Sequence, residues 1–101
     1  MRQIGLTDLY HAARAVQAIP EPARAQACAQ LLRQAHAADK YVKRLRKLHP
    51  EWGDGSLRAA ALARSCEPRL ASMTSDFQAC LLLVLSAVMQ RRGQDGASDF
   101  P

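Results

Sequence analysis

The most apolar stretch of the chain runs from Phe77 to Met89 and reads FQACLLLVLSAVM. Apolar residues recur along it at helical spacing and also fill the other sides of the expected helix. Its apolar run from Ala79, broken only by Ser86, is shorter than the ~20 residues that cross a bilayer. The pattern therefore predicts a buried C-terminal helix that the other helices cover. A self-association face is the alternative interpretation.

Both ends of this helix carry recognisable signals. Ser75 and Gln78 have the spacing of a capping box at the helix start. Residues 91–93, Arg-Arg-Gly, are typical of a helix end. We therefore expect residues 1–93 to form a single helical domain and residues 94–101 to form a disordered tail.

Two helices are expected in the first half of the chain. The first spans about residues 8–18, with Thr7 as its N-cap. The second spans residues 22–48, because it starts at a proline that suits a first turn and meets no helix breaker inside. A break near residues 37–39 would instead give five helices and make the segment that follows a separate element.

A row of apolar residues with seven-residue spacing follows one side of the second helix. Leu31, Ala38 and Leu45 form this row, and Tyr41 and Leu48 form a second one beside it. This is coiled-coil spacing over about three heptads. We expect the seam to pack inside the domain, and packing against another chain is the alternative.

A glycine-containing loop, residues 49–55 or HPEWGDG, separates the second and third helices. The two glycines around Asp54 indicate a tight turn with positive φ. Ser56 is the expected N-cap of an alanine-rich third helix at residues 57–65. Trp52 is expected to fold over the helix junction as an anchor, and a place in a binding surface is its alternative role.

These elements define an all-α fold, a compact bundle of four helices around a buried C-terminal helix. We expect the second and C-terminal helices to form the main packing pair, with the first and third helices covering them. The sequence contains no internal repeat and no pattern typical of a strand.

The formal net charge of +5 is concentrated in one segment. Its five basic residues, with no acid among them, are Lys40, Lys43, Arg44, Arg46 and Lys47. Without them, nine basic and nine acidic residues remain, so the rest of the chain is balanced. In a continuous helix, Lys40, Lys43 and Lys47 would point together, away from the apolar seam. This face either contacts phosphates or an acidic partner, or is simply solvated.

The sequence favours a small non-enzymatic interaction or regulatory protein. It would bind an acidic protein surface through the basic face and the Trp52 loop. The first alternative is a nucleic-acid-associated protein that uses the same face, with roughly 3–4 phosphate contacts and weak, salt-sensitive binding. The linker of about nine residues before the C-terminal helix is too long for a compact helix-turn-helix. The second alternative is a structural subunit of a homo-oligomer.

Candidate catalytic and metal-binding residues do not form recognisable patterns. The three histidines are on separate segments and the three cysteines form no CxxC pair (His11, His36, His49; Cys28, Cys66, Cys80). Cys28 and His36 would lie about 12 Å apart along one helix, too far for a dyad. We therefore expect no enzyme activity, no metal and no cofactor. The odd cysteine number and the lack of a secretory signal favour a reducing, cytoplasmic setting, with no membrane association.

The segment from His49 to Leu57, HPEWGDGSL, followed by an alanine-rich helix, resembles a small uncharacterised bacterial family of helical proteins. Members of that family carry a similar His-Pro-x-Trp-Gly-x-Gly-Ser-Leu stretch in chains of about this length. The resemblance covers most of the chain. It implies no activity, cofactor or site residue.

Overall fold

The computed structural model describes residues 3–64 and 74–99, with side chains described as far as Arg91. Four α-helices and one short 3₁₀ helix make up these residues: α1 (Leu6–Gln17), η1 (Glu21–Ala23), α2 (Arg24–Leu45), α3 (Leu57–Arg64) and α4 (Ser75–Asp99). The described ranges contain no strand, only an isolated bridge between His49 and Gly53. The predicted all-α bundle is confirmed. None of these helices combines the length and the hydropathy that a membrane-crossing segment requires.

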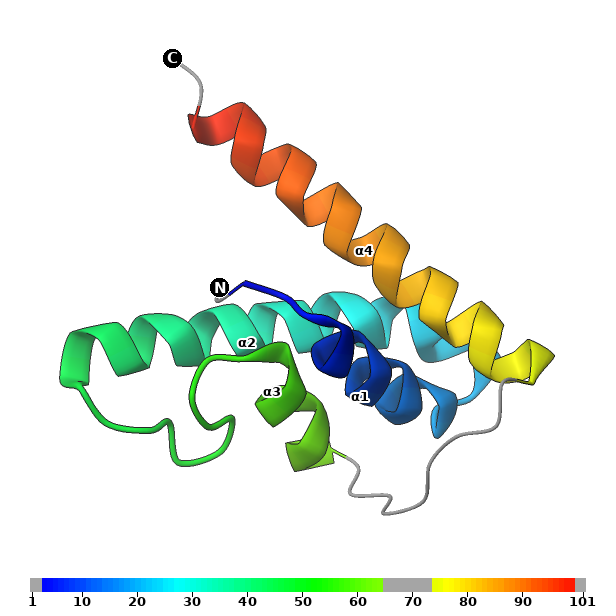
Figure 1. Cartoon of the computed structure of the whole chain (residues 1–101), viewed down its shortest axis with the longest axis horizontal. Coiled ribbons are helices and arrows are strands. Elements are labelled where there is room, and N and C mark those ends of the chain that lie inside the picture. Colours follow the sequence, from blue (N-terminus) through cyan, green and yellow to red (C-terminus); the bar gives the residue numbers. More distant parts are fainter. Residues whose placement is uncertain (1–2, 65–73, 100–101) are drawn as a thin grey trace.

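Helix α1 lies at the centre of the bundle, in contact with α2, α3 and α4 (Figure 1). Its inward side is almost entirely alanine, and Ala12, Ala13, Ala15 and Val16 are buried. Small side chains let neighbouring helices approach closely from several directions. The prediction that α2 and α4 form the main packing pair, with α1 as a cover, is therefore wrong.

Helix α4 buries one stripe rather than all its sides. The residues of this stripe are Phe77, Cys80, Val84 and Val88. On the opposite side, Leu82 is 64% exposed, Leu85 is 36% exposed and Met89 is 71% exposed. Figure 1 shows the reason: α4 crosses the bundle diagonally and its second half projects beyond the other helices. The prediction of a helix buried all round is wrong.

The ends of α4 also differ from the prediction. Thr74, one residue before the expected cap Ser75, accepts a hydrogen bond at its Oγ1 from the Phe77 N–H over 3.2 Å. At the other end the helix continues through Gly93 to Asp99. The predicted end at Gly93 is wrong, and most of the segment expected to be a tail belongs to α4.

Helix α1 begins earlier than expected. Gly5 is its N-cap, and the Gly5 N–H donates to Asp8 Oδ2 over 2.8 Å. Thr7, the expected cap, lies inside the first turn. A glycine is an acceptable N-cap, and the Asp8 carboxylate satisfies the free amide that precedes the helix.

Helix α2 is continuous through residues 37–39, so the five-helix alternative is not formed. Leu31 and Ala38 of the predicted seam are buried inside the domain, as expected. The helix ends at Leu45, which is 50% exposed, and Leu48 beyond it is 66% exposed. The seam therefore packs within the domain along its first two positions only.

Candidate partner-binding surface on helix α2

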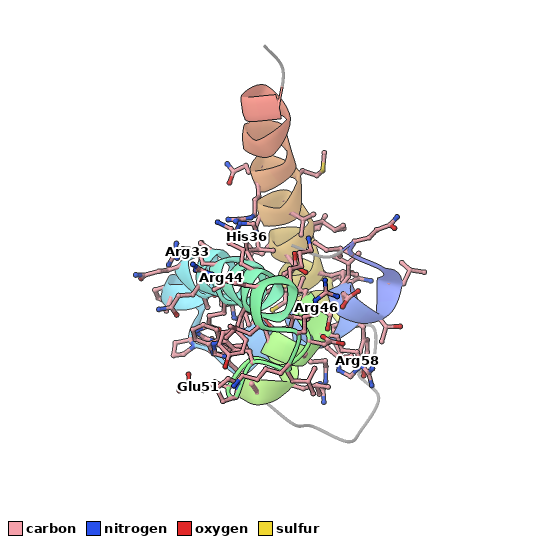
Figure 2. All side chains as sticks on the ribbon, turned by 90° about the vertical axis from the view of Figure 1, so that its left-hand side faces the viewer. Arg33, His36, Arg44, Arg46, Glu51 and Arg58 are labelled. Atoms are coloured by element: carbon pink, nitrogen blue, oxygen red, sulfur yellow. The ribbon has the colours of Figure 1, made fainter. Side chains whose placement is uncertain are left out.

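The exposed side of α2 carries Arg33, Lys40 and Arg44 on a single stripe. At 100° per residue these positions share the side opposite the buried Leu31, Ala35 and Ala38. Arg33 and Arg44 are eleven residues apart, about 16 Å along the helix axis. We call these three residues the basic stripe. Figure 2, which shows α2 from its C-terminal end, places Arg33 and Arg44 together on one flank.

The only acidic residue of α2 is Asp39, and it does not reach the basic stripe. Asp39 is buried, with 3% of its surface exposed, and its Oδ2 atom forms an ion pair with Lys43 Nζ over 3.0 Å. Burial alone would raise the pKa of Asp39, but hydrogen bonding and the charge of the Lys43 ammonium favour the ionised form. The net result is a lowered pKa. Lys43, predicted as a binding residue, is exposed and forms an ion pair with the buried Asp39 of its own helix.

The predicted face of Lys40, Lys43 and Lys47 is not formed, because α2 ends before Lys47. Arg46 terminates the helix in the left-handed conformation, with φ of 57°, and its N–H donates to the Val42 carbonyl over 2.8 Å. Arg46 and Lys47 are exposed beyond the helix. Figure 2 places Arg46 on the other side of the helix end from Arg44.

Trp52 belongs to a tightly organised loop. The Nδ1 atom of His49 accepts hydrogen bonds from the Glu51 and Trp52 N–H groups, both over 3.1 Å. The His49 ring stacks on Trp52 with centroids 4.6 Å apart and meets the edge of Tyr41 at 4.8 Å. Trp52 is half-buried and stacks on His49, and it is the His49 ring that contacts Tyr41 of α2.

The same loop positions α3 and shields Asp39. Both predicted positive-φ glycines are confirmed, with φ of 74° at Gly53 and 92° at Gly55. Asp54 Oδ1 accepts from the Ser56 N–H over 3.0 Å, and Ser56 Oγ accepts from the Ala59 N–H over 3.1 Å. Ser56 is therefore the N-cap that the sequence predicted. The predicted helix end at residue 65 lies outside the described residues.

Sequence reasoning missed Arg33, because it stands outside the dense basic segment. The available signal was its spacing of seven residues from Lys40 and eleven from Arg44, which places all three on one side of a helix. No described acidic side chain pairs with Arg33, Lys40 or Arg44. The stripe is therefore an uncompensated positive surface.

Reactive side chains do not converge on this surface. Cys28 and Cys80 are buried and unpaired, and burial raises the pKa of both thiols. Cys66 lies outside the described residues. Within the described part of the chain, no three His, Cys, Asp or Glu side chains gather as a metal-binding set would.

The fold and this surface define a small all-α domain with one exposed basic helix face. The chain belongs to the family described as Domain of unknown function (DUF7742), whose model matches residues 2–88. Membership of an uncharacterised family is thereby confirmed. No curated protein and no solved structure matches the chain significantly.

Proposed function

We propose that this domain is a small non-enzymatic binding protein that recognises an acidic surface on a partner protein. The observation that carries the proposal is the basic stripe. Arg33, Lys40 and Arg44 lie on one exposed side of a helix whose single carboxylate is buried and paired. A positive patch of this kind steers a negatively charged partner and fixes its orientation.

A protein partner fits the stripe better than a nucleic acid does. Three aligned cations would neutralise about three phosphates, which gives weak and non-specific binding. The two unpaired buried cysteines fit action in a reducing compartment such as the cytoplasm.

The test is affinity capture from nuclease-treated native lysate at about 50 and 200 mM salt. The stripe variant carries Arg33→Glu, Lys40→Glu and Arg44→Glu. Lys43 is left unchanged, because its loss would unpair the buried Asp39. The matched control reverses two exposed arginines of α3, with Arg58→Glu and Arg64→Glu.

We expect the wild type and the α3 control to capture the same defined protein, and the stripe variant to lose it. Capture of that protein by all three chains would contradict the proposal. Retention on DNA that disappears with nuclease treatment and falls steeply with salt would move the function to the nucleic-acid alternative.

A second candidate function is self-association, and the exposed side of α4 favours it. Leu82, Leu85 and Met89 form an apolar face at helical spacing. The seam of α2 no longer supports an oligomer, because Leu31 and Ala38 are buried within the chain. Light scattering over a range of concentrations tests this candidate: a concentration-dependent mass that Leu82→Glu abolishes supports it, and a strict monomer excludes it.

A further inference from the structure

A groove with about 260 Å³ of space lies where α4 passes over α2. Four of its lining residues have apolar side chains, most of them small: Ala25, Ala29, Leu32 and Ala87. Its polar lining comes from Arg33, Gln90 and Arg91. The volume is slightly below the range of about 300–1,000 Å³ typical of drug-sized ligands. The groove therefore suits a small molecule.

Arg91 occupies an inward-facing position on α4. It follows Cys80, Val84 and Val88 on the buried stripe of that helix, so its side chain is directed towards α2. Its Nε atom is buried and has no hydrogen-bond partner among the described residues. A buried N–H donor without an acceptor is rare and unfavourable in folded proteins. Arg91, a residue that lines the groove, thus carries an unpaired donor.

Arg33 adds a second guanidinium to the same groove from the opposite helix. Figure 2 places it on one flank of α2, and it is part of the groove lining. No acidic side chain is among the described residues that line the groove. Two guanidinium groups without a carboxylate form a lining that is complementary to an oxyanion, and arginine can bind a carboxylate through two parallel hydrogen bonds.

We propose that this groove binds a small organic carboxylate with a short apolar body. Arg91 and Arg33 hold the carboxylate, and the methyl groups of Ala29 and Ala87 contact the apolar body. A carboxylate on an alkyl chain uses both parts of the lining, whereas inorganic phosphate uses only the guanidinium groups. Arg33 belongs both to this groove and to the basic stripe. Lys40 and Arg44 do not line the groove, so variants of these two residues distinguish the groove from the stripe.

The test is a titration of the ¹⁵N-labelled full chain, followed by the arginine Nε–H signals and the backbone amides. The probes are sodium hexanoate, sodium acetate and sodium phosphate at matched ionic strength. We expect hexanoate to shift Arg91, Arg33 and Ala29 in a saturable way. Acetate should bind about a hundredfold more weakly, because it lacks four methylene groups and each one that is buried contributes to affinity. Equal responses to all three anions, or none, would overturn the proposal.

Matched variants locate the site. Arg91→Gln and Arg33→Gln should each weaken hexanoate binding about tenfold, because each removes a charge-assisted hydrogen bond. Arg44→Gln, on the same helix but outside the groove, should change it less than about twofold. Unchanged binding by the first two variants would overturn the proposal.

A steric variant tests the apolar part of the groove lining without removing charge. It also keeps the proposal testable if Arg91→Gln fails to fold. Ala29→Leu fills the groove and should abolish hexanoate binding. Ala37→Leu adds the same bulk at an exposed position two turns further along α2 and should leave binding unchanged. Thermal unfolding of each variant confirms that the fold is retained. Equal hexanoate binding by both alanine variants would refute this placement of the ligand.

Discussion

At the level of single residues, Gly55 is the point where the loop before α3 comes closest to α2. Its φ is 92°, and a Cβ atom placed there would lie 2.6 Å from Asp39 Cα and 2.9 Å from Asp39 Cβ. The nearest atoms that this Cβ would meet are the N, Cα and Cβ atoms of Asp39. These atoms are fixed by the helix backbone, so they cannot move aside easily. We expect Gly55→Ala to cost more than about 1 kcal/mol of unfolding free energy in urea denaturation.

The matched control for Gly55 is Gly5. Gly5 has a negative φ of −104°, and a Cβ atom there would come no closer than 3.7 Å to Asp8 Oδ2. Gly5→Ala should therefore cost only the difference in N-cap preference, below about 1 kcal/mol. Equal costs at the two glycines would show that the close approach to Asp39 does not matter.

Asp39 should link the stability of the domain to pH. Its folded-state pKa lies below the ordinary value of 3.8, so its ionised form is stabilised by folding. That contribution is complete above about pH 4 and is lost as the pH falls through the folded-state pKa. Asp39→Asn should cost about 1–3 kcal/mol at neutral pH. The gap between wild type and variant should narrow towards about pH 2.5, as measured by urea denaturation.

The control for this prediction is a change on the other partner. Lys43→Gln removes the ammonium and leaves the Asp39 carboxylate buried without it. This variant should also be destabilised at neutral pH, and the wild-type advantage should again shrink in acid. A difference between wild type and Asp39→Asn that stays constant across this pH range would disprove the linkage.

At the level of helices, the sequence predicted the elements that local signals determine. Ser56 caps α3 as expected, because its hydroxyl accepts a hydrogen bond from the N–H of Ala59, only three residues further on. The positive-φ glycines were predictable for the same reason. The burial of α4 was not, because an apolar run does not show how much neighbouring surface is available to cover it. Leu82 and Met89 are exposed only because α4 leaves the bundle at an angle.

The candidate surface was predictable in part. Lys40 and Arg44 lie on the exposed side of α2 as expected, but the end of the helix at Leu45 separates Lys47 from them. The helix ends where Arg46 adopts the left-handed conformation, which glycine usually takes, so the sequence did not mark this position. The contribution of Arg33 to the surface could be found only from its spacing to Lys40 and Arg44, because it stands outside the dense basic segment.

At the start of α4, the predicted N-cap is Ser75 and the observed N-cap is Thr74, and substitution of each residue distinguishes them. Thr74 Oγ1 accepts from the Phe77 N–H, and the Thr74 carbonyl accepts from the Gln78 N–H over 2.9 Å. Thr74→Ala should therefore cost about 1 kcal/mol, whereas Ser75→Ala should be nearly neutral. Chemical denaturation monitored by circular dichroism measures both. The opposite order would restore Ser75 as the cap.

At the level of the whole molecule, the centre of the bundle could not be read from hydrophobicity. Helix α1 is central because its small alanine side chains let the other helices pack closely against it. An alanine-rich helix has little apolar surface for each residue, so its hydrophobicity does not mark it as the centre of a core. The arrangement also depends on contacts between residues that are far apart in the sequence. Arg24 and Asp76, 52 residues apart, form the clearest of these contacts.

Arg24 connects three helices at one end of the bundle. Its Nη1 lies 2.8 Å from Asp76 Oδ1 at the start of α4, and its Nε donates to the Ile19 carbonyl over 2.8 Å. Its Nη2 donates to the Gln17 carbonyl at the end of α1 over 3.2 Å. The Gln17 side chain donates to the same carboxylate over 3.1 Å. Hydrogen bonds from Arg24 and Gln17 lower the pKa of Asp76, and this contribution to stability disappears as the pH falls through that pKa.

The contacts of Arg24 with Asp76, Ile19 and Gln17 depend on the shape of its guanidinium group. Arg24→Lys keeps the charge but loses the planar fork that bonds Asp76, Ile19 and Gln17 together. We expect a lower denaturation midpoint for Arg24→Lys and a still lower one for Arg24→Ala. Arg64 is the matched control, since it also joins two helices but through one exposed hydrogen bond to Gln30. Arg64→Lys should leave the midpoint nearly unchanged. Equal effects of the two lysine variants would mean that charge alone, rather than the three-way junction, holds the ends of α1, α2 and α4 together.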